Sequence, residues 1–511
     1  ESANTRKEWL SKYDRNATLD YNSPYVTIDE FINYDLIHFS NSDNIRSIPN
    51  IMDGLKPSQR KVLFASLKRN LTDKEIRVAQ LAGYTSENAA YHHGEMSLNG
   101  TIINMAQHFI GSNNIPLLED VGQFGTRIGG GKDAGQPRYI YTKLSTITPT
   151  LYNSQDFALM DAQYDDGLKV EPVFYTPIIP MILVNGSSGI GTGWSTEVPC
   201  FNPLDIIDNI NNYLNGVPMK EIVPWYNGFT GTIVKLTETS FLTKGKYEIS
   251  GNKLIVTELP IGKWTDKYKE DLENMIIDIK NKSTKQIIRS YLTYSTDVKV
   301  HFEIMCDASV LAKLDVYDEK LNMTKLEKTF KLCSTISTNN MVLYDDKSSI
   351  KRYKNVLSII ENYCNVRKHY YQLRIDYIIK GLTEQIDILS HKARFIGEFI
   401  NNTINIIKTK KEVIIEQLKT KKYPEVLGNW DYLLKMPIYN LSQDKIDELN
   451  DQLANKEQEL AYINAQTPAS LWKNELNKLS HVLPTTLSKL LGETPIKKKL
   501  KIVKKKKVQV N

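Results

Sequence analysis

The stretch GLKPSQRKVLFASLKRN, residues 54–70, sets the character of the first part of the chain. Apolar side chains recur in it at helical spacing, and Pro57 stands where the first helical turn needs no N–H donor. The apolar positions are Val62, Leu63, Phe64 and Leu67. Because the other face is cationic, we predict an amphipathic helix that begins at Pro57.

Two further short helices are predicted after it, over residues 74–82 and 94–109. Glycine-rich turns follow at 122–127 and 129–135, and an apolar, β-branched stretch follows at 139–147. Three short helices before such a stretch fit a helix-turn-helix unit of the winged-helix kind, in which the third helix enters the DNA major groove.

The later sequence predicts two other kinds of structure. Residues 161–350 contain short β-rich segments, which indicate a separate α+β module. The expected strands are 231–236, 246–250, 253–260 and 298–304. From residue 351 an apolar heptad seam runs from Ile359 to Tyr377, slips in register before Leu382 and then resumes. A second apolar series, from Ile446 to Ile463, suits a helix packed antiparallel on the first, with residues 401–440 folded at the tip.

Length and composition exclude several classes of protein. A chain of 511 residues suggests three or four domains. The four cysteines stand far apart in the sequence, so neither a disulfide framework nor a zinc site is expected. We therefore expect an intracellular protein. No apolar run is long enough to span a membrane. The beginning, ESANTRKEWL, has no Met and no signal region, so we expect a fragment of a longer protein.

The formal net charge of +6 is misleading as a total. The last sixteen residues hold eight lysines and no acid, so the remainder of the chain is slightly acidic. Residues 44–70, in contrast, carry six basic residues against Asp53 alone, and residues 151–171 are acidic. We therefore expect a local DNA-binding patch in residues 44–70. The lysine tail is expected to be a solvated tail, with an import signal or nonspecific DNA contact as the second interpretation.

The segment AYHHGEMSL, residues 90–98, places His92, His93 and Glu95 at a helix start. A metal cluster is the weakest interpretation, because the spacing differs from that of zinc helices. Contact with a phosphate at the helix start and a buried, hydrogen-bonded imidazole are both open alternatives.

The segment GQPRYIY, residues 135–141, places Arg138 beside Tyr139 after a glycine run. A free tyrosine phenol has a pKa of about 10, so a nucleophilic tyrosine needs a base or cationic neighbours. The fork of an arginine suits two oxygens of one phosphate, which favours phosphoryl transfer over acyl transfer. Packing remains the default for any one of 28 tyrosines.

In GSSGIGTGWS, residues 186–195, the apolar Ile190 stands between glycines. The segment lacks the Lys-Ser/Thr pair of a P-loop, so nucleotide binding is not expected there. Ile190 suits a wedge between stacked bases, and a buried tight turn is the alternative.

Several segments together resemble a known family: SNSDNIRSIPNIMDGLKPSQRKVLF at 40–64, AYHHGEMSL at 90–98, GQFGTRIGGGKDAGQPRYI at 122–140, IIPMILVNGSSGIGTGWS at 178–195 and YLLKMPIYNLS at 432–442. In this order they resemble the DNA-cleavage core of a eukaryotic-type type IIA DNA topoisomerase over nearly the whole chain. The resemblance implies a multidomain α+β protein: the trailing edge of a TOPRIM domain with a linker at 1–29, a winged-helix DNA-binding and cleavage domain at 30–160, a tower domain at 161–350, a long antiparallel coiled coil at 351–480 with a small helical dimer exit gate at about 401–440, and a basic tail at 481–511.

The resemblance also implies roles for single residues. Tyr139 corresponds to the nucleophile that becomes linked to a 5′ phosphate, and Arg138 and His93 correspond to residues that stabilise the phosphate in the transition state. Ile190 corresponds to the residue that intercalates and bends the duplex. The remaining expected DNA contacts are Arg46, Lys56, Arg60, Lys61, His92, Gln123 and Arg127.

For cofactors and partners, the resemblance implies Mg²⁺ held by acids of a TOPRIM domain, ATP used by the full-length enzyme, double-stranded DNA, and a homodimer closed through the exit gate. The acidic run of a TOPRIM domain does not occur in this sequence, so we expect the chain to bind DNA and dimerise but not to cleave by itself. Its abundant Lys, Asn, Ile and Tyr suggest an AT-rich genome, such as that of a large DNA virus or a protist. The expected location of the protein is the host cytoplasm if the source is a virus and the nucleus if it is a cell. Two rival interpretations are the GyrA-type chain of a bacterial gyrase, which carries YHPHGD in place of YHHGE, and a DNA clamp without chemistry.

Overall fold

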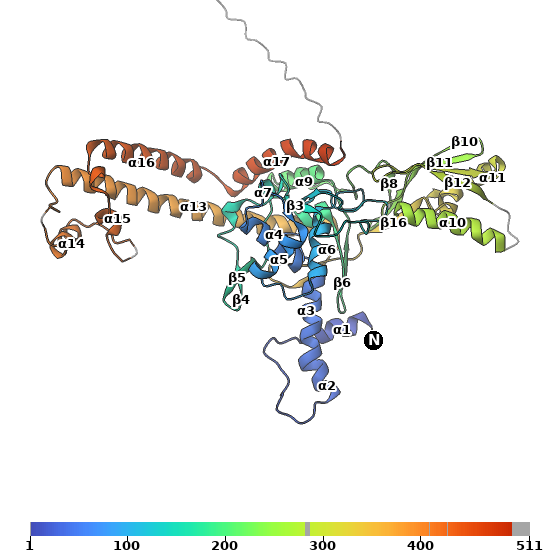
Figure 1. The fold of residues 1–511 in the computed structure, drawn as a ribbon, viewed down its shortest axis with the longest axis horizontal. Helices are drawn as coiled ribbons and strands as arrows, with labels where there is room; N and C mark the ends of the chain where they lie inside the picture. The colour runs from blue at the N-terminus through green and yellow to red at the C-terminus, as the bar shows by residue number, and fades with distance from the viewer. Residues whose placement is uncertain (1, 282–286, 408, 427, 493–511) are drawn as a thin grey trace, which may run out of the picture. The chain divides into compact units, whose positions relative to one another are not determined.

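The computed structural model describes residues 2–281, 287–407, 409–426 and 428–492, which fall into two compact units (Figure 1). The second unit is Lys368–Asn474, and the first is the rest of the described chain. The basic tail was expected at 481–511, but the chain is helical as far as Leu490, and residues from 493 onward lie outside the described residues.

Three helices and a small sheet form the centre of the first unit (Figure 1). The helices are α4 (Pro57–Lys68), α5 (Val78–Asn88) and α6 (Glu95–Ala106). The strands β1 (Ile76–Arg77), β3 (Tyr141–Leu144) and β2 (Leu118–Val121) pair antiparallel in that order. Pro57 begins α4 as predicted, and the Gln59 side chain accepts the N–H of Lys56 at 2.9 Å. The predicted helix at 74–82 is wrong at its start, because Ile76 and Arg77 pair with β3 before the helix begins.

Further elements of the first unit precede and follow this centre along the chain. The N-terminal part contains α1 (Ala3–Leu10), α2 (Ile28–Phe31), the π-helical turn η1 (Ile32–Leu36) and α3 (Ile37–Ser47). Three two-stranded hairpins follow along the chain: β4 (Ala162–Asp165) with β5 (Leu168–Pro172), β6 (Ser187–Ile190) with β7 (Ser195–Val198), and β17 (Met341–Tyr344) with β18 (Ile350–Tyr353). Two helical pieces precede the first hairpin, α7 (Thr148–Leu151) and η2 (Ser154–Asp156). The helix α8 (Met181–Asn185) lies between the first two hairpins, and α9 (Pro203–Leu214) follows the second.

Residues 232–337 form the expected β-rich part. One sheet has the order β10-β11-β13-β12 and another the order β16-β9-β8. The strands of these two sheets are β8 (Thr232–Thr237), β9 (Ser240–Lys244), β10 (Lys246–Ser250), β11 (Lys253–Glu258), β12 (Ile288–Thr293), β13 (Phe302–Cys306) and β16 (Cys333–Ser337). The same part of the chain contains the helices α10 (Thr265–Asn281), α11 (Ala308–Leu314) and α12 (Lys325–Thr329). It also contains the short strand pair β14 (Tyr317–Asp318) and β15 (Met323–Thr324). Tyr268 of α10 packs edge-on against Phe302 of β13 in a buried apolar core. The four predicted strands are confirmed, although the last begins at Phe302 rather than 298.

The long helix α13 (Val356–Ile400) runs through the predicted register slip without a break. Its predicted seam is only partly buried, since Ile359, Tyr363 and Tyr370 are inside whereas Tyr377 is 53% exposed. The buried positions include Arg367 and Arg374, which an apolar pattern cannot identify. Despite its 45 residues, neither α13 nor any other helix within the described ranges is long and apolar enough to cross a membrane.

The second unit ends in a small helical head with its own core. The head contains α14 (Lys411–Thr420), α15 (Asp431–Leu434) and the turn η3 (Ile438–Asn440), and the chain returns through α16 (Gln443–Asn464) and α17 (Pro468–Leu490). Its core is Phe395, Ile404, Leu418, Tyr423, Trp430 and Leu433. A Cβ placed on Gly397 would lie 3.9 Å from Ile446, so the end of α13 meets the start of α16, as expected for antiparallel helices (Figure 1).

Candidate active site

Tyr139 occupies a short turn just before β3. The N–H groups of Val78 and Ala79, at the start of α5, donate to the carbonyls of Ile140 at 3.0 Å and Pro137 at 3.1 Å. A helix start leaves such N–H groups without an internal partner, so the turn and the helix stabilise each other. Ile140 is buried whereas Tyr139 is 71% exposed. The Tyr139 backbone is therefore fixed and its phenol is open to an incoming molecule.

Arg138 is a neighbour of Tyr139 in space as well as in sequence. Its guanidinium carbon lies 5.5 Å from the centre of the Tyr139 ring, and both side chains are exposed. A guanidinium at this distance interacts with the ring face while its N–H groups remain available to an anion. The pair can thus present a phenol oxygen and a cationic fork to the same phosphate.

His92 and His93 lie after the other end of α5, on the connection to α6, and both are exposed. The His92 Nε2 atom is 2.9 Å from Asp165 Oδ2, and the His93 ring meets the Tyr91 ring edge-on at 5.3 Å between centres. Between them and the Tyr139 turn runs α5, whose 11 residues span about 16 Å. Within the described chain His93 and Tyr139 share no hydrogen bond, ion pair or ring contact. His93 and Arg138 therefore lie beyond opposite ends of α5.

The metal interpretation of His92, His93 and Glu95 gains no support. Within the described ranges, no group of three or more His, Cys, Asp or Glu side chains is arranged to hold a metal ion. The start of α6 at Gly94 has no side-chain cap, so its first N–H groups are available to another acceptor. This arrangement suits a phosphate better than a cation.

The surroundings of Arg60 contradict its expected contact with DNA. Its side chain is buried, with Nε 2.6 Å from Asp53 Oδ2 and a terminal nitrogen 2.8 Å from the Leu55 carbonyl. Asp53 is fully buried and also accepts the N–H of Tyr175 at 3.0 Å. Arg60 thus neutralises a buried carboxylate, which the α4 charge pattern alone did not reveal.

Lys61 and Arg127 also make structural ion pairs. Lys61 donates to the Ala89 carbonyl at 2.6 Å and pairs with Glu171 at 3.0 Å. Arg127, 4% exposed, pairs with Glu258 of β11 at 2.5 Å. Arg60, Lys61 and Arg127 are thus held in ion pairs within the fold, which opposes the DNA contacts expected of them.

Arg46 and Lys56 remain suitable for DNA contact. The Arg46 side chain is 55% exposed in the last turn of α3 and pairs with Asp43 at 3.2 Å. Lys56 donates to the Ser188 carbonyl at 2.7 Å, and burial lowers the pKa of its ammonium group. Lys56 therefore supports the β6–β7 hairpin with one donor, and an ammonium group has two further N–H donors that can meet a phosphate.

The β6–β7 hairpin displays Ile190, which is 85% exposed at the end of β6. Glycines on either side let the hairpin approach α3 closely. A Cβ on Gly189 would lie 2.0 Å from the Ser47 carbonyl oxygen, and one on Gly191 would lie 2.2 Å from Asn44 Oδ1. The alternative of a buried turn is wrong, because the backbone is packed and the Ile190 side chain is outside.

The glycine-rich loop that leads to Tyr139 is packed on itself. The Gln107 amide donates to the carbonyls of Phe124 at 2.8 Å and Gly131 at 3.2 Å, and a Cβ on Gly125 would lie 2.6 Å from Gly131. Burial alone would raise the pKa of Asp133, but hydrogen bonds from Thr126 lower it below its ordinary value. The glycines thus serve loop packing, and the loop does not form an open phosphate cradle.

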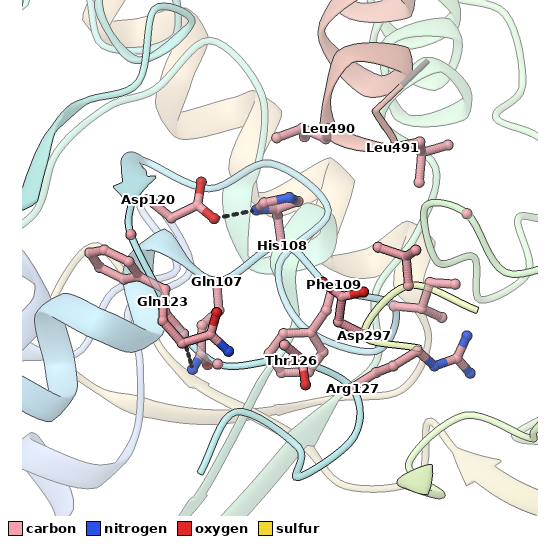
Figure 2. A pocket seen from close by; sticks show the side chains of 16 residues that line it. Gln107, His108, Phe109, Asp120, Gln123, Thr126, Arg127, Asp297, Leu490 and Leu491 are labelled. Carbon is pink, nitrogen blue, oxygen red and sulfur yellow. Dashed lines mark hydrogen bonds and ion pairs between the residues drawn. The ribbon is translucent and has the colours of Figure 1, made fainter. Parts of the chain in front are cut away.

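A cavity of about 440 Å³ lies against the segment 122–127 of this loop (Figure 2). Figure 2 shows His108 and Asp120 side by side in its lining, with Nδ1 and Oδ2 3.4 Å apart. Burial raises the pKa of Asp120, and His108 partly opposes that effect. Gln123, an expected DNA contact, is exposed and lines this cavity.

Asp165 and Glu171 were not predicted as partners of the site. The Asp166-Gly167 pair with φ of 46° and 79° marks a tight hairpin turn, which the sequence DG signals. Its docking against the histidine connection could not be predicted, because His92 and Asp165 are 73 residues apart.

Comparison with known families gives two matches. Residues 46–477 match the family of the DNA gyrase/topoisomerase IV A subunits. Residues 1–44 match the C-terminal associated domain of TOPRIM.

Individual relatives agree with the family match. The chain is 40% identical over 536 residues to DNA topoisomerase 2 of Plasmodium falciparum (isolate K1 / Thailand), covering 98% of this chain and 38% of that protein. It is 36% identical over 538 residues to DNA topoisomerase 2 of Acanthamoeba polyphaga mimivirus, covering 93% and 42%. A crystal structure of the Plasmodium falciparum topoisomerase II DNA-binding, cleavage and re-ligation domain superposes with a TM-score of 0.83 at 40% identity, covering 96% of this chain and 69% of that one. The chain thus spans about two fifths of the length of these curated relatives.

Proposed function

Because this chain belongs to the type II DNA topoisomerase family, we propose that it is the part of such an enzyme that binds a DNA duplex, breaks both strands through Tyr139 and reseals them. The relatives are topoisomerase 2 proteins, which favours this function over that of a bacterial gyrase chain. In the full-length enzyme the cycle includes strand passage and depends on ATP.

The observation that carries the proposal is the exposed Tyr139 phenol beside Arg138 on an anchored turn. A nucleophile must be open to its substrate and held in position, and both conditions are met here. In the proposed reaction Tyr139 Oη attacks a backbone phosphorus and gives up its proton. A bond from phosphorus to the phenol oxygen forms, the bond to the 3′ oxygen breaks, and that oxygen takes up a proton. One phosphodiester replaces another, so attack by the 3′ oxygen reverses the break without an outside energy source.

The remaining side chains would bind and shape the duplex. Arg46 and Lys56 are proposed phosphate contacts, and Arg138 would hold two oxygens of the attacked phosphate. Ile190 is the proposed wedge, because an exposed apolar side chain on a rigid hairpin suits insertion between base pairs. In domain terms, we propose that α4–α6 with β1–β3 form the winged-helix domain and that residues 232–337 belong to the tower.

We propose that the chain acts as a homodimer closed through the head of the second unit. Ile438 and Tyr439 are 86% and 81% exposed there, an apolar surface that a second copy could bury. A dimer would also allow the histidine connection of one copy to approach the phosphate attacked by Tyr139 of the other, whereas within one copy the length of α5 lies between them.

Mg²⁺ and ATP are assigned to other parts of the enzyme. The described residues present no cluster that fits a metal ion, and the glycine segment at 186–195 lacks P-loop residues. We propose that Mg²⁺ is held by acids of a TOPRIM domain, and no step above depends on it. For location, relatives from rat and mimivirus are compatible with either the nucleus or the host cytoplasm.

The test is plasmid cleavage by a TOPRIM-containing version of the protein, with Mg²⁺, followed by denaturation and protease treatment. We expect broken DNA with protein linked to its 5′ ends. Tyr139→Phe should abolish the linkage and retain DNA binding, while Tyr164→Phe, on the exposed β4–β5 hairpin, is the matched control and should cleave normally. Cleavage that survives Tyr139→Phe would contradict the assignment, and DNA binding without any cleavage in the unaltered protein would favour the clamp.

A further inference from the structure

The β4–β5 hairpin lies along the connection that carries His92 and His93, and two polar ties join them. At the base of the hairpin, buried Glu171 pairs with Lys61, which also donates to the Ala89 carbonyl just after α5. At the tip, Asp165 Oδ2 lies 2.9 Å from His92 Nε2. One hairpin is therefore fixed at both ends to the same short connection.

The connection has few other constraints. Ala90 has a φ of 48°, a left-handed conformation that a residue with a Cβ adopts rarely. Tyr91 is buried and anchors the backbone, but the His92 side chain is 70% exposed and projects from it. Asp165 is the one hydrogen-bond partner of the His92 ring in the described chain. Without Asp165, no hydrogen bond within the described residues would fix the orientation of the His92 ring.

We propose that Asp165 is a positioning residue that holds the His92 imidazole in the orientation needed to meet a DNA phosphate. A carboxylate that accepts a hydrogen bond from one ring nitrogen fixes both the ring plane and the tautomer of a histidine. With Nε2 donating to Asp165, the other edge of the ring faces away from the hairpin. This inference deepens the proposed function, because it concerns how the same enzyme arranges its phosphate contacts.

The charge of the hairpin makes the proposal distinguishable from a general electrostatic effect. Asp165 and Asp166 both place negative charge near His92, which repels a phosphate. Loss of either charge should strengthen DNA binding slightly. Only the loss of Asp165 should also misplace His92. The lost charge should then strengthen DNA binding while the misplaced His92 lowers the cleavage rate, so kinetic measurements can separate the two effects.

The experiment measures the initial rate of covalent cleavage against DNA concentration in the TOPRIM-containing protein. Asp165→Ala is expected to lower the maximal rate about tenfold, in the range that misplaced groups cause, without raising the half-saturating DNA concentration. Asp165→Asn, whose amide oxygen can still accept from Nε2, should restore most of the rate. Asp166→Asn is the matched control: it removes the same charge, tolerates the positive φ at that position and should keep the full rate.

A double-mutant cycle tests whether Asp165 acts through His92. In a His92→Ala background, Asp165→Ala should cause no further loss. An equal loss in both backgrounds, or no loss in the unaltered background, would overturn the proposal. If the unaltered protein forms no covalent complex, the proposed function has failed instead, so the two failures are distinct. Little change in the thermal unfolding of each variant is expected, since the His92 side chain is 70% exposed and that of Asp165 37%.

Discussion

Arg60→Gln is predicted to destabilise the first unit and to leave the electrostatic component of DNA binding unchanged. Sequence position alone suggests the reverse, because Arg60 lies on the cationic α4 helix among expected DNA contacts. In the structure its guanidinium makes contacts of 2.6, 3.1 and 2.8 Å with Asp53 and the Leu55 carbonyl. Neither charged partner faces solvent.

The expected magnitude follows from what the substitution leaves behind. Asp53 would remain in a fully buried position with its compensating cation removed. Removing one partner of a buried ion pair costs about 3–5 kcal/mol. That loss is a large part of the roughly 5–15 kcal/mol that stabilises an ordinary domain. Arg60→Lys should recover only part of it, because an ammonium group cannot make the two-nitrogen contact with Asp53.

The assay compares Arg60→Gln with Arg46→Gln, a matched change at an exposed position. Thermal unfolding should shift strongly for Arg60→Gln and little for Arg46→Gln. Duplex binding measured between about 50 and 200 mM salt should behave oppositely: loss of a phosphate contact lowers the slope of log affinity against log salt by about 0.9. We expect that decrease for Arg46→Gln alone. A stable Arg60→Gln protein with a slope reduced by about one would refute the reasoning.

Three further predictions concern the wedge and the loop. Gly189→Ala should displace the β6–β7 hairpin, because the added methyl would meet the Ser47 carbonyl at 2.0 Å, and DNA bending measured by end-to-end energy transfer should fall. Ile190→Ala should reduce bending while leaving thermal unfolding unchanged, since the side chain is already 85% exposed; unchanged bending would contradict the wedge. The pKa of Asp133 is lowered in the folded chain, so its stabilisation of the loop is present at neutral pH and lost as the pH falls through that lowered pKa; amide exchange of residues 122–135 should rise in acid, and Asp133→Asn should remove the pH dependence.

The sequence predicted those parts of the fold that depend on local periodicity. The helix from Pro57 begins where proline geometry requires, and strand Lys246–Ser250 has the expected bounds. The helix predicted at residue 74 fails at its start because Ile76 and Arg77 pair with Thr142 and Tyr141 of a strand much later in the sequence. Helical spacing carries no information about such a partner.

Adjacency in sequence was enough to place Arg138 beside Tyr139, and the structure adds that the Tyr139 side chain is exposed. Their chemical roles came from the family resemblance and stay predictions. Charge on α4 was misleading, because a basic residue facing solvent and one facing a buried acid look alike in sequence. The acid that pairs with Lys61 is 110 residues away, so only the fold could reveal it.

The close packing of the Ile190 hairpin has a mechanical consequence. The hairpin and its turn are bonded to Asn44, Lys56 and Asn340, and no space remains beside Gly189 for it to retreat. Where the proposed wedge meets a duplex, we expect the rigid hairpin to keep its place and the DNA to deform. The work of deformation then depends on the base steps at the wedge, and pyrimidine–purine steps open most easily. A preference for certain cleavage sequences would thus arise from the stiffness of one small hairpin, without any side chain that reads a base.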